Sequence, residues 1–308
     1  MKELKDLRIV YMGTPEFAVA SLEALVNEGL NIVGVITAPD KPKGRGQQLA
    51  GSPVKNYAIE QGLHVLQPTN LKAESFLEEL KALNADLQIV VAFRMLPEVV
   101  WNMPPLGTFN LHASLLPQYR GAAPINWAII NGETETGVTT FFLQHEIDTG
   151  NILVQEKEPI LPTDNVGSLY ERLMQKGAKV VVETVKQIQS EKVSPKEQPH
   201  VEEMKFAPKL YKETCEINWD WSALQVHNFV RGLNPYPAAW SVFGEHQFKV
   251  FETEIDNDSS LAPGAIDSDN KTYIKVGCGM GAVSIKELQM QGKKRMKTEE
   301  FLKGNKLV

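Results

Sequence analysis

This sequence of 308 residues has few cysteines and no long apolar run. Its two cysteines are Cys215 and Cys278, and isolated cysteines without an export signal are usually free thiols. No stretch approaches the ~20 apolar residues that cross a bilayer. A strand begins as early as Arg8, which leaves no room for a signal peptide. We therefore expect a cytoplasmic protein that does not enter a membrane.

The sequence also lacks the motifs of two common enzyme classes. Its six histidines are scattered, without a His-Glu-x-x-His motif or a cysteine pair, so no metal site is expected. The first turn, Gly13-Thr14-Pro15, lacks the Gly-x-Gly-x-x-Gly pattern that cradles a dinucleotide. A metal-dependent hydrolase and a dinucleotide-dependent oxidoreductase are therefore disfavoured. Loss of activity on chelation, or saturable NAD binding, would revive them.

An overall excess of basic residues is missing as well. The net charge of −6 argues at first against a nucleic-acid partner, but the distribution of charge matters more than its sum. Residues 1–203 carry 18 Lys and Arg against 25 Asp and Glu, whereas residues 204–308 carry 14 against 13. The stretch 286–306 holds seven basic and three acidic residues. The global charge therefore excludes little.

Short apolar strands alternate with amphipathic helices over the first part of the chain. Strands rich in Val and Ile that alternate with helices are typical of a parallel sheet covered on both faces. The pattern predicts an α/β fold with a Rossmann-like open, mainly parallel sheet. Expected strands are 8–12, 31–37, 87–92, 107–112 and 138–143, and expected helices are 17–26, 54–61, 73–83 and 168–189.

The composition changes between residues 190 and 208, where three prolines and interspersed charges make a poor helix or strand. We expect a catalytic domain over 1–189, a linker over 190–208 and a smaller domain over 209–308. The residue pattern over 209–308 predicts a helix and short strands separated by glycine-containing turns. This arrangement is typical of a small OB-like β-barrel. The helix is expected over 223–233 and the strands over 239–243, 248–252, 272–276 and 282–288.

A group of polar residues gathers at the end of one expected strand. Asn110 and His112 are two residues apart, so their side chains share a face. They lie at the carboxyl end of the strand, where open α/β sheets bind their ligands. A downstream loop between two strands contains Asp148-Thr149-Gly150. Transfer of an acyl or formyl group to an amine requires stabilisation of the carbonyl oxygen and movement of protons, which an Asn, a His and an Asp can provide. Taken alone, each could equally be a turn residue or a hydrogen-bonded core histidine.

The surrounding residues favour the catalytic interpretation. Asn110 to Pro117, then Arg120-Gly121-Ala122-Ala123-Pro124, and then Asp148-Thr149-Gly150 resemble, in order and spacing, the signature of the folate-dependent formyltransferases. The resemblance implies that Asn110 and His112 polarise the formyl group of 10-formyltetrahydrofolate and that Asp148 tunes the proton transfers. It also implies a folate site lined by Ser114, Leu115, Leu116 and Pro117. Two positions depart from the family pattern: Arg94 stands in an expected tyrosine- and glycine-containing turn, and Gln118 replaces a basic residue.

The acceptor of the formyl group is inferred from other parts of the chain. A basic loop over residues 38–49 carries Lys41, Lys43 and Arg45, and a second basic segment carries Lys293, Lys294 and Arg295. Such cations can contact phosphates or stack on bases. Both segments resemble those of the family members that act on tRNA, and with the additional domain this resemblance implies initiator methionyl-tRNA as the acceptor. A monomeric enzyme is also expected. A small amine, such as an amino-sugar nucleotide, is the alternative. A non-catalytic RNA-binding module is a third possibility, but it leaves Asn110, His112 and Asp148 unexplained.

Overall fold

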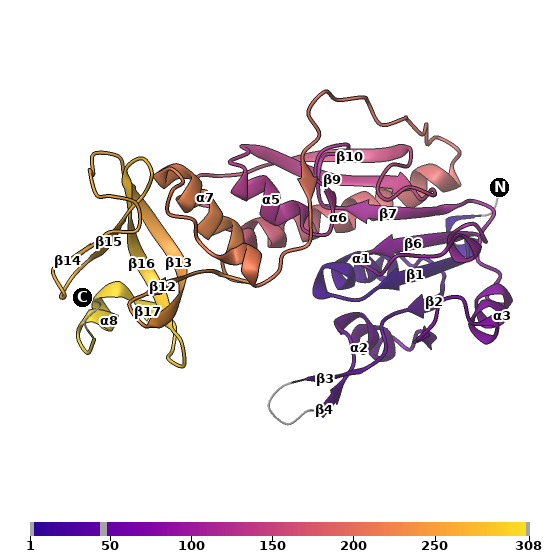
Figure 1. Ribbon diagram of the computed structural model, residues 1–308. Helices are drawn as coiled ribbons and strands as arrows, with labels where there is room; N and C mark the ends of the chain where they lie inside the picture. Colours follow the sequence, from indigo (N-terminus) through magenta and orange to yellow (C-terminus); the bar gives the residue numbers. More distant parts are fainter. Residues whose placement is uncertain (1–2, 44–47, 306–308) are drawn as a thin grey trace. The chain divides into compact units, whose positions relative to one another are not determined.

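The computed structural model describes residues 3–43 and 48–305 and divides the chain into two compact units (Figure 1). The first unit contains the residues up to Arg120, together with 137–158 and 171–205. The second contains 121–136, 159–170 and 206–308. The units are thus interleaved along the sequence rather than successive.

The first unit is built on a seven-stranded sheet in the order β10-β9-β7-β6-β1-β2-β5. Five neighbouring strands are parallel to one another, namely β7, β6, β1, β2 and β5, and β9 runs antiparallel to β7. This confirms the expected Rossmann-like, mainly parallel sheet. The strands are β1 (Ile9–Gly13), β2 (Ile32–Ile36), β5 (Val65–Leu66), β6 (Leu87–Val91), β7 (Thr108–His112), β9 (Glu135–Phe142) and β10 (Ile152–Pro159).

Helices cover both faces of this sheet. Each helix and strand expected in this part of the chain is present, with ends that differ by at most three residues. The unit also contains a short hairpin that the sequence did not predict, formed by β3 (Lys41–Lys43) and β4 (Gln48–Ala50). The helices are α1 (Glu16–Asn27), α2 (Pro53–Glu60), α3 (Glu74–Ala82), α4 (Glu98–Trp101) and α6 (Val166–Gln189), of which α6 continues from the second unit.

The alternation of side chains along each strand separates the two faces. On one face the Tyr11 hydroxyl donates to the Ala18 carbonyl of α1 at 2.5 Å. Leu111 packs on the same face against Gly177 of α6, where a Cβ would lie 2.7 Å from the leucine. On the opposite face Val90 belongs to an apolar cluster with residues of α3 and α4. Asn110 is the register partner of Val90, so it points to this second face.

The segment expected to be a linker is fixed to the first unit. Lys196 and Ile152 exchange two backbone hydrogen bonds, of 2.7 and 2.9 Å. Further on, the Tyr119 amide donates to the Lys205 carbonyl at 2.6 Å. The prolines do prevent a long helix or strand here, as expected, but isolated hydrogen bonds hold the extended chain against the sheet.

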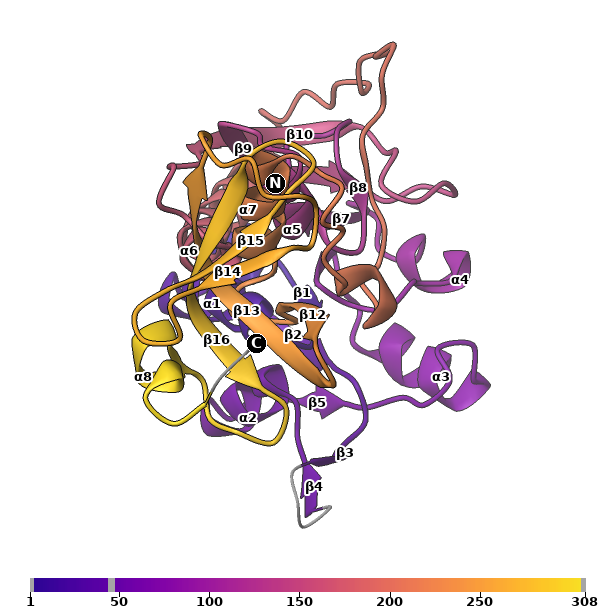
Figure 2. The same ribbon diagram turned by 60° about the vertical axis from the view of Figure 1, so that its left-hand side comes forward.

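The second unit combines two packed helices with a curled antiparallel sheet (Figure 2). Asn126 of α5 donates to the Gly232 carbonyl of α7 at 2.8 Å, and α7 begins with a capping box formed by Ser222 and Gln225. The sheet order is β12-β13-β16-β15-β14, with β17 paired to β16. This confirms the expected small barrel-type domain. The elements are β8 (Arg120–Gly121), α5 (Pro124–Ile130), β11 (Phe206–Ala207), α7 (Ala223–Leu233), β12 (Ala239–Phe243), β13 (His246–Asp256), β14 (Ile266–Ser268), β15 (Ile274–Gly277), β16 (Ala282–Met290), β17 (Met296–Lys297) and α8 (Thr298–Leu302).

The core of the second unit contains both cysteines. Cys215 and Cys278 are buried and free, which confirms the expectation from the sequence. They belong to an apolar cluster with residues of α7 and the curled sheet. Within the described part of the chain, no helix has both the length and the apolar character that crossing a membrane requires.

Candidate active site

The carboxyl end of β7 presents Asn110 and His112 on one face, as the strand period predicts. His112 is buried, with 7% of its surface exposed. Asn110 is half-buried. Its Oδ1 atom is shielded from solvent and has no hydrogen-bond partner among the described residues. A buried polar atom without a partner is unfavourable and uncommon, so this amide is a candidate for binding a ligand.

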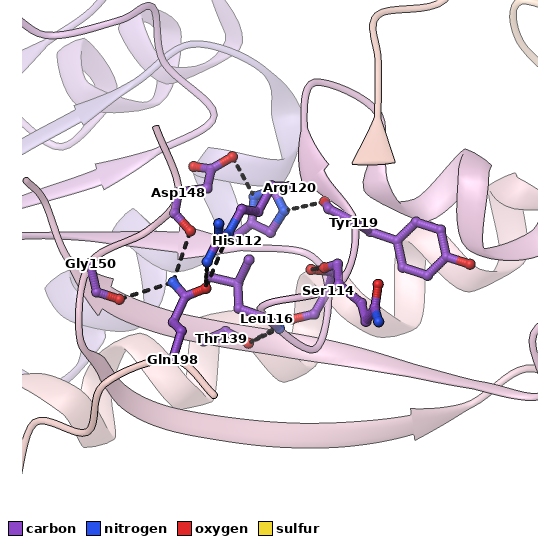
Figure 3. A network of polar contacts seen from close by, with 10 residues as sticks. His112, Ser114, Leu116, Tyr119, Arg120, Thr139, Asp148, Gly150 and Gln198 are labelled. Atoms are coloured by element: carbon purple, nitrogen blue, oxygen red, sulfur yellow. Dashed lines mark hydrogen bonds and ion pairs between the residues drawn. The ribbon is translucent and has the colours of Figure 1, made fainter. Parts of the chain in front are cut away.

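The imidazole of His112 has two different surroundings (Figure 3). Nε2 lies 2.8 Å from the Tyr119 carbonyl oxygen, and because a carbonyl only accepts, Nε2 carries the proton. Nδ1 lies 3.9 Å from Oδ2 of Asp148, which is within ion-pair range but too long for a hydrogen bond. Nδ1 is therefore the ring nitrogen that the backbone leaves available for a substrate.

Asp148 comes from the loop between β9 and β10, and its side chain is 12% exposed. Its backbone has a φ of +55°, a left-handed conformation that Asp tolerates better than most residues. Thr149 donates its hydroxyl to the Glu146 carbonyl at 3.0 Å. Gly150 is required because a Cβ there would collide with the Phe142 carbonyl oxygen. The Asp-Thr-Gly sequence thus builds a tight turn that directs the carboxylate to His112.

The predicted folate segment, Ser114 to Pro117, forms a buried loop after β7. Ser114 is fully buried, and its hydroxyl donates to the Gln118 carbonyl at 2.7 Å. Leu116 and Pro117, joined by a cis peptide bond, are buried as well, and Leu115 is half-buried. The structure therefore gives Ser114, Leu116 and Pro117 a supporting position and leaves Leu115 the most accessible of the four.

Two strands support this loop through residues that the sequence did not single out. Thr139 of β9 donates its hydroxyl to the Ser114 carbonyl at 2.6 Å. Gln155 of β10 donates to the Leu116 carbonyl at 3.0 Å and to Thr139 Oγ1 at 2.9 Å. No local sequence pattern marks such residues, because their role depends on which strands become neighbours.

A cavity of ≈ 800 Å³ opens at the same edge of the sheet. Its walls are formed by the segments that come directly after β5 and β6 in the sequence. The carboxyl ends of β5, β6 and β7 lie at the same edge of the sheet. The Arg94 guanidinium donates to the carbonyl of Thr69 at 2.9 Å and to that of Pro68, so it joins the two walls. Its partial burial lowers the pKa of Arg94. The cavity is lined by Thr69, Asn70, Leu71, Lys72, Arg94, Met95, Leu96, Pro97, Glu98 and Val99.

The first basic segment, expected to be a loop, contains the paired strands β3 and β4. Lys41 is exposed on β3. Lys43 pairs with Gln48 in the backbone register, and Arg45 lies outside the described residues. Asp40, at the base of the hairpin, accepts hydrogen bonds from Gln67 and Lys55, which lower the pKa of its carboxyl group.

The second basic segment is the turn between β16 and β17. Lys293 and Lys294 are exposed. Arg295 differs, because its guanidinium pairs with Glu287 at 2.5 Å and lies 4.1 Å from the centre of the Phe251 ring. All three cations are exposed, but only Arg295 is also held by an ion pair and an aromatic ring of the sheet.

None of the described residues form a group of three or more histidine, cysteine, aspartate or glutamate side chains suited to a metal ion. Asn110, His112 and Asp148 can act on a bound carbonyl group through hydrogen bonds and charge. This is the kind of site that group transfer to an amine requires.

The sequence matches two family patterns. The Formyl transferase family matches residues 7–185, and the family of the formyl transferase C-terminal domain matches residues 209–306. The chain therefore belongs to the formyl transferase family. It is 57% identical over 312 residues to the methionyl-tRNA formyltransferase of Bacteroides thetaiotaomicron, covering 98% of this chain and 97% of that protein. The methionyl-tRNA formyltransferase of Flavobacterium johnsoniae is 52% identical, with coverage of 98% and 97%.

Solved structures show the same fold at low sequence identity. An N-formyltransferase from Helicobacter canadensis, in complex with folinic acid and dTDP-3-aminofucose, is 20% identical with a TM-score of 0.68, covering 94% of this chain and 100% of that chain. A variant of HypX from Aquifex aeolicus is 19% identical with a TM-score of 0.66, covering 98% of this chain and 49% of that chain.

Proposed function

We propose that this protein transfers the formyl group of 10-formyltetrahydrofolate to the α-amino group of initiator methionyl-tRNA. The observation that carries the proposal is the 50–57% identity to methionyl-tRNA formyltransferases along nearly the whole chain, through both family domains. The gathering of Asn110, His112 and Asp148 at one edge of the sheet supports it. The alternative acceptor, an amino-sugar nucleotide, has no comparable support.

The reaction joins the α-amino nitrogen to the formyl carbon and breaks the bond from that carbon to N10 of the folate. We assign the Asn110 amide to donate a hydrogen bond to the formyl oxygen as negative charge develops there. Protonated Nδ1 of His112 donates to the same oxygen, and the Asp148 carboxylate neutralises the imidazolium. The attacking nitrogen loses one proton and N10 gains one as tetrahydrofolate leaves. No covalent enzyme intermediate is needed.

The binding sites follow as further parts of this proposal. The ≈ 800 Å³ cavity has apolar walls, including Leu71, Leu96 and Val99, and two cations, Lys72 and Arg94. This combination suits a flat apolar ring with an anionic tail. The folate would reach from there to Leu115 in the loop after β7. No metal takes part in the proposed scheme.

The tRNA would contact cations of both basic segments: Lys41, Lys43 and Arg45 of the first, and Lys293 and Lys294, with Arg295 beside them, of the second. We retain the division into a catalytic domain (1–189), a linker (190–208) and a tRNA-binding domain (209–308). We also propose a monomer that acts in the cytoplasm, because initiator tRNA is charged and used there.

An acceptor competition tests this function. The purified chain is incubated with 10-formyltetrahydrofolate and an equal mixture of charged initiator tRNA, glycinamide ribonucleotide and UDP-amino-arabinose. We expect formylmethionyl-tRNA as the product. Formylation of a small amine alone would overturn the acceptor while leaving the one-carbon chemistry in place.

A further inference from the structure

Gln198 lies in the proline-containing segment that the sequence predicts to be a linker. Its neighbours from 194 to 200 are exposed, whereas Gln198 itself is half-buried. Its side chain points toward the candidate active site (Figure 3). We infer that Gln198 is a positioning residue for the transfer reaction and that it acts by holding Asp148 opposite His112.

The amide of Gln198 uses its full hydrogen-bonding capacity. Nε2 donates to the carbonyl oxygens of Asp148 and Gly150, at 2.8 and 3.0 Å. Oε1 accepts from Nε and Nη2 of Arg120, at 3.2 and 2.5 Å. An amide has two N–H donors and two lone pairs, so none is left over. Such a fully satisfied group fixes the distance between the two loops that it joins.

These contacts close a ring around the imidazole. His112 donates from Nε2 to the carbonyl of Tyr119, the residue that precedes Arg120. Arg120 binds Gln198, and Gln198 binds the backbone of Asp148. The Asp148 carboxylate then faces Nδ1 of the same imidazole at 3.9 Å. Gln198 therefore sets where the carboxylate stands relative to the loop that holds the other side of His112.

Attachment of the segment to the sheet does not depend on Gln198. Lys196 exchanges two backbone hydrogen bonds with Ile152. Gln118 donates to the Glu203 carbonyl at 2.9 Å and accepts from the Lys205 amide at 2.7 Å. These contacts hold the chain on both sides of residue 198. The Gln198 side chain is thus available to position the Asp148 loop.

Three variants of the full-length chain test the inference, which rests on the proposed function. Gln198→Ala removes the connection, and we expect kcat to fall ~10- to 100-fold, since a displacement of about 1 Å can have an effect of that size. We expect KM for folate and tRNA to stay within ~3-fold. Gln198→Glu should lose at least as much activity. Its carboxylate still binds Arg120, but it places an oxygen against the carbonyls of Asp148 and Gly150. Gln118→Ala is the matched control: it removes two hydrogen bonds to the same segment and should retain kcat.

A double-mutant cycle identifies the route of the effect. Asp148→Asn should already lower kcat strongly, and adding Gln198→Ala should then lower it by less than ~3-fold, because both changes remove the same interaction. The inference would be overturned if the fold-losses in kcat of Asp148→Asn and Gln198→Ala multiplied in the double variant. It would also be overturned if Gln198→Glu kept the kcat of the wild-type chain, or if Gln118→Ala lost as much kcat as Gln198→Ala. If the wild-type chain formylated only a small amine, the acceptor proposal would fail, and the same cycle with that amine would still decide the role of Gln198.

Discussion

At the scale of single residues, Asn110 has an unsatisfied side-chain oxygen and lies within the candidate active site. Its Oδ1 atom is buried without a partner among the described residues. Leaving such a group unpaired costs about 1–3 kcal/mol, and proteins keep unfavourable groups of this kind mainly where function requires them. The side chain lies two residues from His112 on the same face of β7. Its contribution to activity and its contribution to stability should therefore have opposite signs.

Replacement of Asn110 by the similarly sized Leu tests this opposition. We expect single-turnover formyl transfer to slow by ~100-fold or more, the usual effect of losing an oxyanion donor. The free energy of unfolding in denaturant should stay equal or rise. Thr136→Val is a matched control, because Thr136 Oγ1 is also buried without a partner in the described structure. The control should leave transfer unchanged. A destabilised Asn110→Leu variant with normal transfer would contradict the prediction.

Burial of Cys278 leads to a prediction about how stability depends on pH. Burial raises the pKa of its thiol to about 11, from an ordinary value of 9.0. A raised pKa in the folded state contributes stability that is fully present below pH 9 and is lost as the pH rises through 11. The free energy of unfolding should therefore decline between pH 9 and 11. Cys278→Ala should show a shallower decline in denaturant titrations over that range, and identical slopes would argue against this cause.

At the scale of elements, the turn between β16 and β17 separates two kinds of cation. All three cations, Lys293, Lys294 and Arg295, are exposed, but Arg295 also contacts Glu287 and the Phe251 ring. A cation that already has a partner gains less from a phosphate, because the existing contacts must be exchanged. The turn should therefore bind tRNA mainly through its two lysines.

Alanine variants measured by tRNA binding at several salt concentrations test this division. Lys293→Ala and Lys294→Ala should weaken binding, and each lost phosphate contact should reduce the slope of log affinity against log salt by ~1. Arg295→Ala should change affinity less but lower the unfolding midpoint. A larger loss of affinity in Arg295→Ala than in both lysine variants together would show that the arginine leaves its partners.

At the scale of the whole molecule, each unit is assembled from three separate stretches of the chain. Residues 121–136, which include α5, belong to the unit formed mainly by the C-terminal part of the sequence. Ile130 of α5 packs so closely on α7 that a Cβ at Gly232 would lie 2.6 Å from it. A boundary drawn near residue 208 therefore divides the sequence but does not separate two independent packing units.

Truncation after Pro208 should consequently damage more than tRNA binding. The remaining chain exposes the surface of α5 that α7 covers, so we expect weaker unfolding cooperativity and binding of an apolar dye. Denaturant unfolding followed by tryptophan fluorescence would measure the first effect. Cooperative unfolding at the midpoint of the full chain, without dye binding, would show that the N-terminal part folds independently.

The sequence by itself determined the fold class and predicted part of the candidate site, because strand alternation, turn chemistry and the motif resemblance all depend on residues close together in the chain. The strand period placed Asn110 and His112 on one face, and the turn chemistry of Asp148-Thr149-Gly150 indicated a loop. The contacts that complete the site could not be predicted this way. Gln198 lies in the expected linker, and the Ser114 hydroxyl, in the segment predicted to line the folate site, donates to the Gln118 carbonyl of its own loop.

Only the tertiary structure decided which distant residues support the site. Arg120 and Gln198 are 78 residues apart in sequence, and Asp148 and Gln198 are 50 apart. Their approach depends on the order of strands in the sheet and on the path of the segment across it. Neither the hydrophobic periodicity nor a turn signal in the sequence predicts the path of this segment. Local patterns and the motif resemblance therefore predicted the candidate reacting groups, and long-range packing determined the geometry in which they are held.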